Sequence, residues 1–187
     1  AHTFTTEAVA NFFGRYATDP AWMQYMGIIN ANEAGKIAGD AFNAFRLQQL
    51  VFSRWAQVMY RFEKAMYENP DQDLNQLWWE KKKKYQMMKE PEGRDMPDWA
   101  TKIHVALYPC YYHNYLLGEL LASQFAGYIN SSLVTGDTAA DMKALGEFFR
   151  TKVFMPGMRY QWNDMIEKAT GEKLTAKYYA AQVVGEK

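Results

Sequence analysis

The sequence predicts an all-α protein. Ala, Met, Leu, Glu, Lys and Gln, which favour helix, dominate its 187 residues. Val, Ile and Thr are scattered, so almost nothing shows the alternation of a half-buried strand. Apolar residues instead recur every three to four positions, which is the period of an amphipathic helix. We therefore expect about eight helices from this periodicity, organised as a single helical unit over residues 1–187.

Four helices are expected in the first half of the chain. Pro20 suits the first turn of a helix, and Pro70 stops one. Asp71 or Asp73 can cap the helix that follows. Residues 31–69 carry one apolar stripe that drifts slowly around the helix axis, so they form one long helix or two abutting ones. The four helices cover residues 5–18 (with Thr at the N-cap), a short segment from 20, 31–69 and 74–88.

Four more helices are expected in the second half, after a charged loop that contains two prolines and a glycine. Pro109 is expected to begin the first of these helices, which leaves residues 102–108 as an extended lead-in. Asp137 can cap the second helix, and Pro156 is expected to begin the third. The loop covers 89–102, and the helices cover 109–129, 138–154, 156–171 and 175–184.

Composition excludes several kinds of partner. Twenty-one basic residues balance twenty-one acidic ones, so no global field recruits nucleic acid or an anionic membrane. No apolar run approaches the roughly 20 residues that span a bilayer. HExxH, a Gly-rich phosphate loop, GxSxG and CxxC are all absent, so the chain by itself holds no complete catalytic set. We expect no nucleic-acid partner and no membrane span in this segment.

The stretch TKIHVALYPCYYHNY is richest in groups that could carry chemistry. Lys102 and His104 are two residues apart, so on an extended chain they point to the same side. Tyr112 and Tyr115 share the first exposed face of the helix that follows Pro109. A cation, an imidazole and two phenols that converge in this way suit a carboxylate and a polarised carbonyl. The same tyrosines could instead form an aromatic core stripe.

Glu7 and Asn11 form a second candidate pair near the N-terminus, within HTFTTEAVANFF. Because they are four residues apart, they lie on one face of the first helix. Glu7 could simply favour the helix dipole from the first turn.

Several stretches, taken in order, carry a resemblance to a known family. They are NQLWWEKKKKYQ, then KIH, then YHNY, with TEAVAN upstream of all three. The set resembles the C-terminal region of the angiotensin-converting-enzyme family of zinc peptidyl dipeptidases, which is related to the thimet and oligoendopeptidase F oligopeptidases. That region follows an Asn-x-x-Trp-Trp, Lys-Tyr-Gln, Lys-x-His and Tyr-x-x-Tyr pattern. The resemblance implies the C-terminal part of a two-lobed, zincin-type helical peptidase.

The resemblance also implies roles for individual residues. Glu7 would be the carboxylate ligand of a single zinc ion, and Asn11 would stand where the family keeps an acid that steadies a zinc-binding histidine. The other two ligands would be histidines of an upstream HExxH that this chain lacks. We therefore expect the chain alone to bind zinc weakly and to be inactive.

The remaining roles concern the peptide. Lys102 and Tyr112 would hold the free C-terminal carboxylate of an oligopeptide, and Tyr111 competes with Tyr112 for that position. His104 would donate to a substrate carbonyl, and Tyr115 would donate to the developing oxyanion. The implied partners are the oligopeptide substrate and the N-terminal part of the same protein. The alternatives are a non-catalytic helical peptide-binding or scaffold domain, and a degenerate peptidase homologue.

Overall fold

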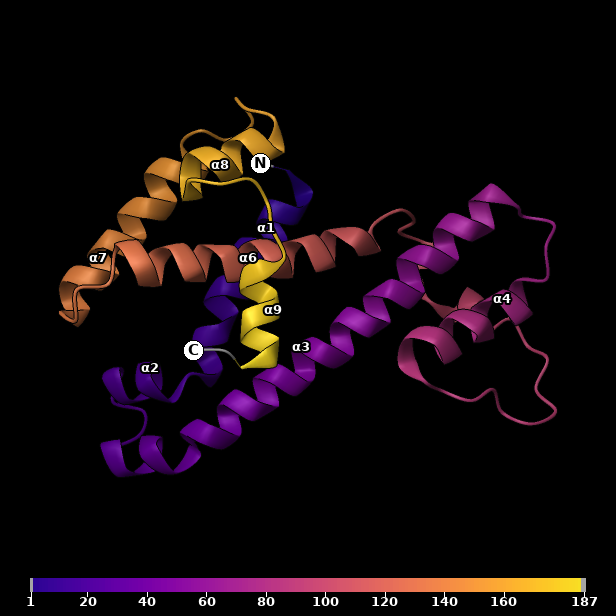
Figure 1. Cartoon of the computed structure of the whole chain (residues 1–187), viewed down its shortest axis with the longest axis horizontal. Helices are drawn as coiled ribbons and strands as arrows, with labels where there is room; N and C mark the ends of the chain where they lie inside the picture. Colours follow the sequence, from indigo (N-terminus) through magenta and orange to yellow (C-terminus); the bar gives the residue numbers. More distant parts are fainter. Residues whose placement is uncertain (1, 186–187) are drawn as a thin grey trace. The chain divides into compact units, whose positions relative to one another are not determined.

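The computed structural model describes residues 2–185, and every regular element in that range is helical, which confirms the all-α class. α3 is the longest helix (Figure 1). The α-helices are α1 (Thr3–Gly14), α2 (Pro20–Tyr25), α3 (Ala31–Glu68), α4 (Leu74–Lys81), α5 (Ile103–Ala106), α6 (Tyr112–Ser132), α7 (Thr138–Phe148), α8 (Trp162–Thr170) and α9 (Lys177–Val184). Short 3-10 turns cover Arg15–Thr18 and Asp98–Thr101, and π-helical turns cover Lys82–Gln86 and Phe149–Phe154.

Several predicted helix boundaries are confirmed. The Asp19 carboxylate accepts from the N–H of Ala21 at 2.9 Å and caps α2. Asp73, rather than Asp71, caps α4 by accepting from the N–H of Gln76 at 2.9 Å. Asp137 caps α7 in the same way. The region from Ala31 forms one continuous helix of 38 residues rather than two abutting helices.

Three predicted helix starts are wrong. The first helix begins at Thr3, with His2 rather than a threonine at its N-cap. Pro109 does not begin α6, because the next residue, Cys110, turns the chain with a left-handed backbone (φ 58°) and gives its N–H to the Glu63 carboxylate. The segment 102–108 also differs from the prediction. It is not extended throughout, because α5 forms one helical turn within it.

Pro156 does not begin a helix either. The π-helical turn extends the preceding helix to Phe154, and Gly157 (φ 58°) then reverses the chain before α8 begins at Trp162. The positive φ at this position suits glycine, which has no Cβ to clash. α8 ends as predicted at Gly171, where φ is 85°.

The chain divides into two compact units. The terminal unit consists of the residues up to Arg46 and from Leu117 onward, and the central unit consists of Leu47–Leu116. Each unit has its own buried apolar cluster.

Phenylalanine rings dominate the core of the terminal unit, where α1 and α9 lie against α6 (Figure 1). Phe12 of α1 meets Phe149 with ring centroids 5.0 Å apart, and Phe125 of α6 meets Phe149 edge to face at 5.4 Å. Each such ring pair contributes about 0.5–1.5 kcal/mol beyond its buried area. The aromatic contacts therefore fix how α1, α6 and the segment after α7 fit together.

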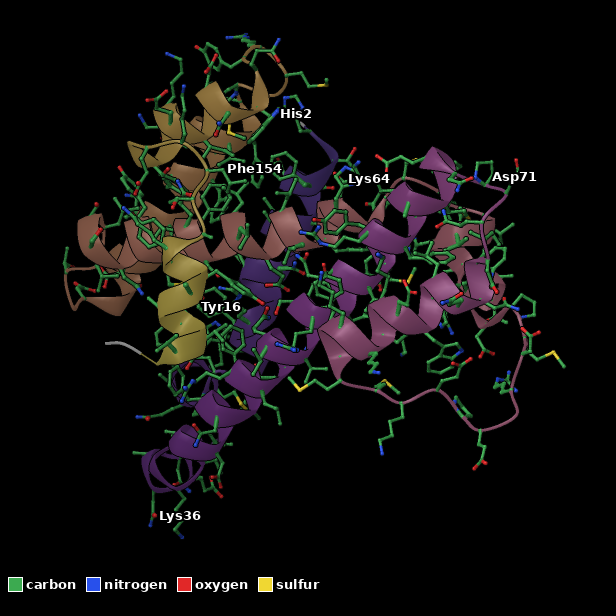
Figure 2. All side chains as sticks on the ribbon, turned by 45° about the vertical axis from the view of Figure 1, so that its right-hand side comes forward. His2, Tyr16, Lys36, Lys64, Asp71 and Phe154 are labelled. Atoms are coloured by element: carbon green, nitrogen blue, oxygen red, sulfur yellow. The ribbon has the colours of Figure 1, made fainter. Side chains whose placement is uncertain are left out.

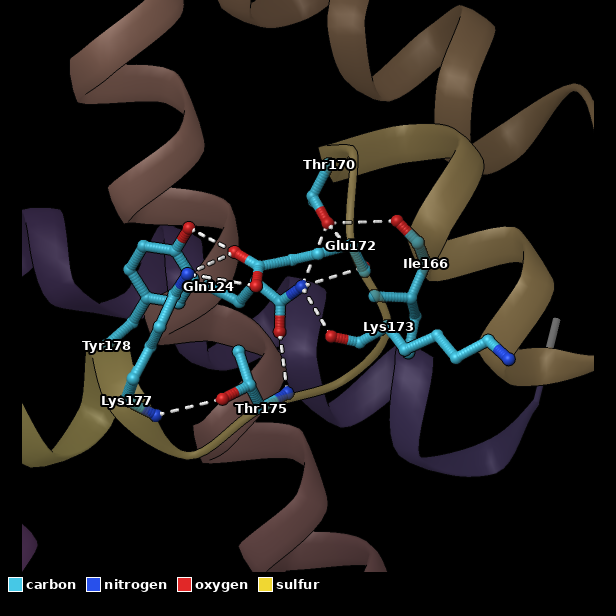
Figure 3. A network of polar contacts seen from close by, with 8 residues as sticks. All are labelled: Gln124, Ile166, Thr170, Glu172, Lys173, Thr175, Lys177 and Tyr178. Atoms are coloured by element: carbon cyan, nitrogen blue, oxygen red, sulfur yellow. Dashed lines mark hydrogen bonds and ion pairs between the residues drawn. The ribbon is translucent and has the colours of Figure 1, made fainter.

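A buried amide ties the C-terminal loop of this unit to α6 (Figure 3). The fully buried Gln124 donates to the Thr170 hydroxyl at 2.9 Å, and its amide oxygen accepts from the N–H of Thr175 at 3.0 Å. The same amide nitrogen also reaches the carbonyl oxygens of Glu172 and Lys173. A buried amide whose groups are all paired in this way specifies one path for the loop.

An ion pair inside the terminal unit joins the end of α1 to α6. The Arg15 guanidinium lies 2.9 Å from the Glu119 carboxylate and 3.1 Å from the Ser123 hydroxyl. The two charged side chains are only 18% and 13% exposed. Because both are largely removed from water, loss of either partner would leave a buried charge uncompensated.

The central unit is built on three tryptophans and a phenylalanine. Phe62 of α3 meets Trp78 of α4 edge to face at 5.2 Å, and Trp55 meets the same indole at 5.9 Å. Trp99 contacts Phe62 at 5.6 Å and donates its indole N–H to the Asn75 side chain at 3.0 Å. The segment after the charged loop is thereby anchored on α3 and α4.

Charged side chains such as those of Lys36, Lys64 and Asp71 extend away from the ribbon and are exposed (Figure 2). Among the described helices, none combines the length and apolar character that crossing a membrane would require.

Gly118 lies where α6 closely approaches α1, and it offers a test of the terminal unit. A Cβ at this position would lie 2.7 Å from Cβ of Glu7 and 3.2 Å from the backbone nitrogen of Ala8. We predict that Gly118→Ala lowers the free energy of unfolding by about 1–2 kcal/mol, because overpacking outweighs the gain in helix propensity.

The matched control is Gly146→Ala in α7, where a Cβ would meet no atom within 4 Å. This variant should leave stability unchanged or raise it by up to about 1 kcal/mol. Urea unfolding midpoints measure both effects, and equal effects of the two variants would contradict the close approach.

Candidate functional site

An imidazole enclosed by tyrosines lies in the central unit, where α5 is followed by the start of α6. The His104 ring stacks on Tyr111 with centroids 5.6 Å apart and an interplanar angle of 15°. Tyr112 and Tyr115 meet it edge to face, at 5.2 Å and 5.3 Å. We call these four residues the histidine cluster. The structure thus brings together four of the five residues predicted for the peptide-binding side of the site.

The two ring nitrogens of His104 have different surroundings. Its Nε2 lies 3.2 Å from the hydroxyl oxygen of Tyr115. Its Nδ1 is buried and has no hydrogen-bond partner among the described residues. When Tyr115 donates to Nε2, the imidazole proton resides on Nδ1, so a ligand carbonyl that reached this atom would satisfy it.

Trp55 fixes the hydroxyl of Tyr112. Its indole N–H donates to the Tyr112 oxygen at 2.5 Å, and the two rings are edge to face at 6.1 Å. Burial raises the pKa of the Tyr112 phenol, with the bond from Trp55 acting in the opposite direction. Tyr112 therefore stays protonated at neutral pH, and its own O–H can be donated to an acceptor.

Two lysines are electrostatically coupled within the same unit. Lys102 precedes α5 with an extended backbone (φ −84°, ψ 120°) and is half-buried. Lys82 is also half-buried, and burial together with the charge of Lys102 lowers the pKa of its ammonium. Each ammonium raises the free-energy cost of charging the other. A bound anion would offset this repulsion, so the pair favours an anionic ligand.

The charge of Asp98 acts on both lysines and raises the pKa of Lys82, but one carboxylate does not balance two ammonium groups. Asp98 accepts two hydrogen bonds from the Arg94 guanidinium, at 2.8 Å and 2.5 Å, and these bonds lower the pKa of Asp98. With Asp98 committed to Arg94, the two lysines retain an excess of positive charge.

The residues predicted for the metal lie in the terminal unit. Glu7 is half-buried on α1, where its Cβ faces Gly118 of α6. Asn11 follows one turn later on α1 and is also half-buried. Glu7 and Asn11 were predicted to lie on one helix, and the structure confirms this because both belong to α1.

One geometric expectation for this site is wrong. Lys102 and His104 were expected to share one side of an extended chain, but His104 lies in the helical turn α5. The reason is local, because the N–H groups of Val105 and Ala106 bond back to the carbonyl of Lys102 and close the turn. The helical turn places the His104 ring against the tyrosines.

Sequence reasoning missed Trp55 and Lys82. Trp55 reads as one more member of the apolar stripe of α3, and Lys82 as one of four lysines on a solvated face. A local signal for Lys82 does exist: it lies four residues after Trp78, the spacing at which side chains meet on a helix.

Residues 2–185 contain no group of three His, Cys, Asp or Glu side chains placed to hold a metal ion. We assign no reaction step to a metal.

Comparison with known protein families matches residues 56–185, more than two thirds of the chain, to the carboxypeptidase Taq (M32) metallopeptidases. Comparisons with curated proteins and with solved structures found no match. The matched range includes the whole histidine cluster, Lys82 and Lys102.

The class of protein defined by the helical fold and the matched range is a zinc-dependent metallopeptidase, a hydrolase. Within that class, the chain belongs to the carboxypeptidase Taq (M32) family. The metallopeptidase class expected from the sequence is confirmed, and the matching family is this one rather than the angiotensin-converting enzymes.

Proposed function

We propose that this chain is the C-terminal part of a zinc carboxypeptidase-type enzyme that hydrolyses peptide bonds near the C-terminus of oligopeptides. The observation that carries the proposal is the enclosed imidazole of His104, with a buried, unpartnered Nδ1. Membership of a metallopeptidase family supports the same assignment.

In this proposal, Lys102 and Tyr112 bind the terminal carboxylate of the peptide. An ammonium and a phenol O–H are suitable donors to a carboxylate, and charge-assisted hydrogen bonds of this kind are stronger than neutral ones. Trp55 supports the role of Tyr112, because a hydroxyl that accepts from an indole is left to donate elsewhere. Tyr111 has a different part, since its ring stacks on His104 and holds the imidazole plane.

His104 and Tyr115 act on the peptide carbonyls. His104 donates to a carbonyl of the bound peptide. In the complex the Tyr115 hydroxyl turns from Nε2 of His104 to the oxygen on which negative charge develops during hydrolysis, and its donated hydrogen bond stabilises that charge. The contact between the two side chains, 3.2 Å, supports a shared proton network.

The zinc ion is proposed to be bound by Glu7 together with two histidines of an HExxH segment in the N-terminal part of the same protein. Asn11, one turn from Glu7, is proposed to steady one of those histidines. The N-terminal part and the oligopeptide are thus the two proposed partners.

The products distinguish two forms of this activity. The family description supports release of single C-terminal residues, whereas the peptidyl dipeptidase alternative releases dipeptides. Mass spectrometry of the products from one oligopeptide separates the two. A peptide-binding protein without turnover would yield neither product.

Lys102→Met tests the carboxylate role. We predict that the wild-type chain binds a peptide with a free C-terminus more tightly than its amidated form, and that the substitution weakens binding of the free acid about tenfold while sparing the amide. Isothermal calorimetry measures the four affinities, and Lys89→Met in the exposed loop is the control. Equal losses for acid and amide would exclude a carboxylate contact.

Tyr115→Phe tests the oxyanion role in the zinc-loaded peptidase. Removing one oxyanion donor is expected to lower kcat about 10²–10³-fold with little change in KM. Tyr108→Phe is the control, because Tyr108 is 60% exposed and its ring centroid is 6.2 Å from that of His104. A kcat that is unchanged in Tyr115→Phe would remove this residue from the mechanism.

A further inference from the structure

We propose that Lys82 makes the site selective for peptides whose C-terminal residue is Asp or Glu. Its ammonium binds the side-chain carboxylate of that residue, while Lys102 and Tyr112 bind the terminal carboxylate. This inference rests on the proposed function and adds a substrate class to it.

The position of the Lys82 ammonium is the first observation. Its Nζ lies 5.1 Å from the centroid of the Trp55 ring and 5.8 Å from that of Trp78. Contact with an aromatic face attracts an ammonium, and the attraction is larger for a partly desolvated group such as this one. The ammonium is therefore held at the two indoles, whereas the next residue, Lys83, is exposed.

The second observation is that this ammonium forms no ion pair with the described residues. No carboxylate among the described residues lies within ion-pair distance of Lys82, and the coupled carboxylate of Asp98 is bound to Arg94. Lys102 adds a second positive charge to the same region. A ligand with two negative charges would relieve both the partial desolvation and the mutual repulsion of the lysines.

The third observation connects Lys82 to Tyr112. Trp55 carries the ammonium on its ring face and gives its N–H to the Tyr112 hydroxyl at 2.5 Å. One indole ring therefore separates the cation from the phenol. The two carboxylates of a C-terminal Asp or Glu are joined by a short aliphatic link, so a single residue can reach both groups.

The arrangement also accounts for the sequence around Lys82. Trp78 supplies part of the ring surface from one turn earlier, and the π-helical turn Lys82–Gln86 begins at the lysine. This turn ends the helix that α4 begins, and Met87 follows it with a left-handed backbone (φ 57°). The structure thus sets Lys82 apart from the other lysines of the run.

The test uses four peptides that differ only at the C-terminus: Glu or Gln as the last residue, each as the free acid or the amide. Tryptophan fluorescence and calorimetry report binding to the wild-type chain. The free acid ending in Glu is expected to bind about fivefold more tightly than the one ending in Gln, as for a partly exposed ion pair.

The variants isolate the charge of Lys82. Lys82→Met retains an apolar stem on the indoles and should abolish the preference for Glu without changing the affinity for the Gln peptide. Lys82→Arg should restore the preference, and Lys83→Met, at an exposed position on the same turn, should leave it intact. A thermal unfolding curve for each variant verifies that the fold is retained.

The outcomes separate this inference from the proposed function. Equal affinity for Glu and Gln peptides in the wild-type chain, with the preference for free acid over amide retained, would overturn the role of Lys82 alone. Equal losses for both peptides in Lys82→Met would also overturn it, since they indicate a structural role. If the wild-type chain does not prefer the free acid, or binds none of the four peptides, both the proposed function and this inference fail.

Discussion

Edge-to-face contact between aromatic rings is the interaction on which both units of the chain depend. In the terminal unit, Phe125 of α6 meets Phe149 in this way and Phe4 of α1 meets Trp162 of α8, and in the central unit Trp55 and Phe62 meet Trp78. The quadrupole of each ring favours this angle, so the contacts specify orientation as well as burying area. A chain whose residues are 16% aromatic can therefore hold short helices in fixed positions.

The same interaction positions the candidate site. His104 is held among tyrosines by ring contacts, and its Nε2 contacts the Tyr115 hydroxyl while its buried Nδ1 has no hydrogen-bond partner among the described residues. Trp55 serves the core and the site together, because it packs on Trp78 and also donates to Tyr112. The positive charge of Lys82 and Lys102 beside these rings suits a carboxylate, which agrees with the carboxypeptidase Taq metallopeptidase family of the chain.

Local sequence signals predict much of this fold. The helical period of residues 31–69, the start of α2 at Pro20 and the capping roles of Asp73 and Asp137 depend on neighbours within one or two turns, and the structure confirms them. The predicted starts at Pro109 and Pro156 fail because left-handed residues just after each proline turn the chain. The partnership of Trp55, Lys82 and Tyr112 joins residues from three separate elements, so no local pattern of any one of them reveals it.

The central claim is that His104 lies in a site for the C-terminal end of a peptide. The most direct measurement is an NMR titration of the chain, carrying isotope-labelled histidine, with a peptide that has a free C-terminus. The ring resonances of His104 should shift saturably while those of the exposed His113 stay in place, and the amidated peptide should cause a much smaller change. Equal shifts for the two histidines, or equal responses to the acid and the amide, would contradict the account.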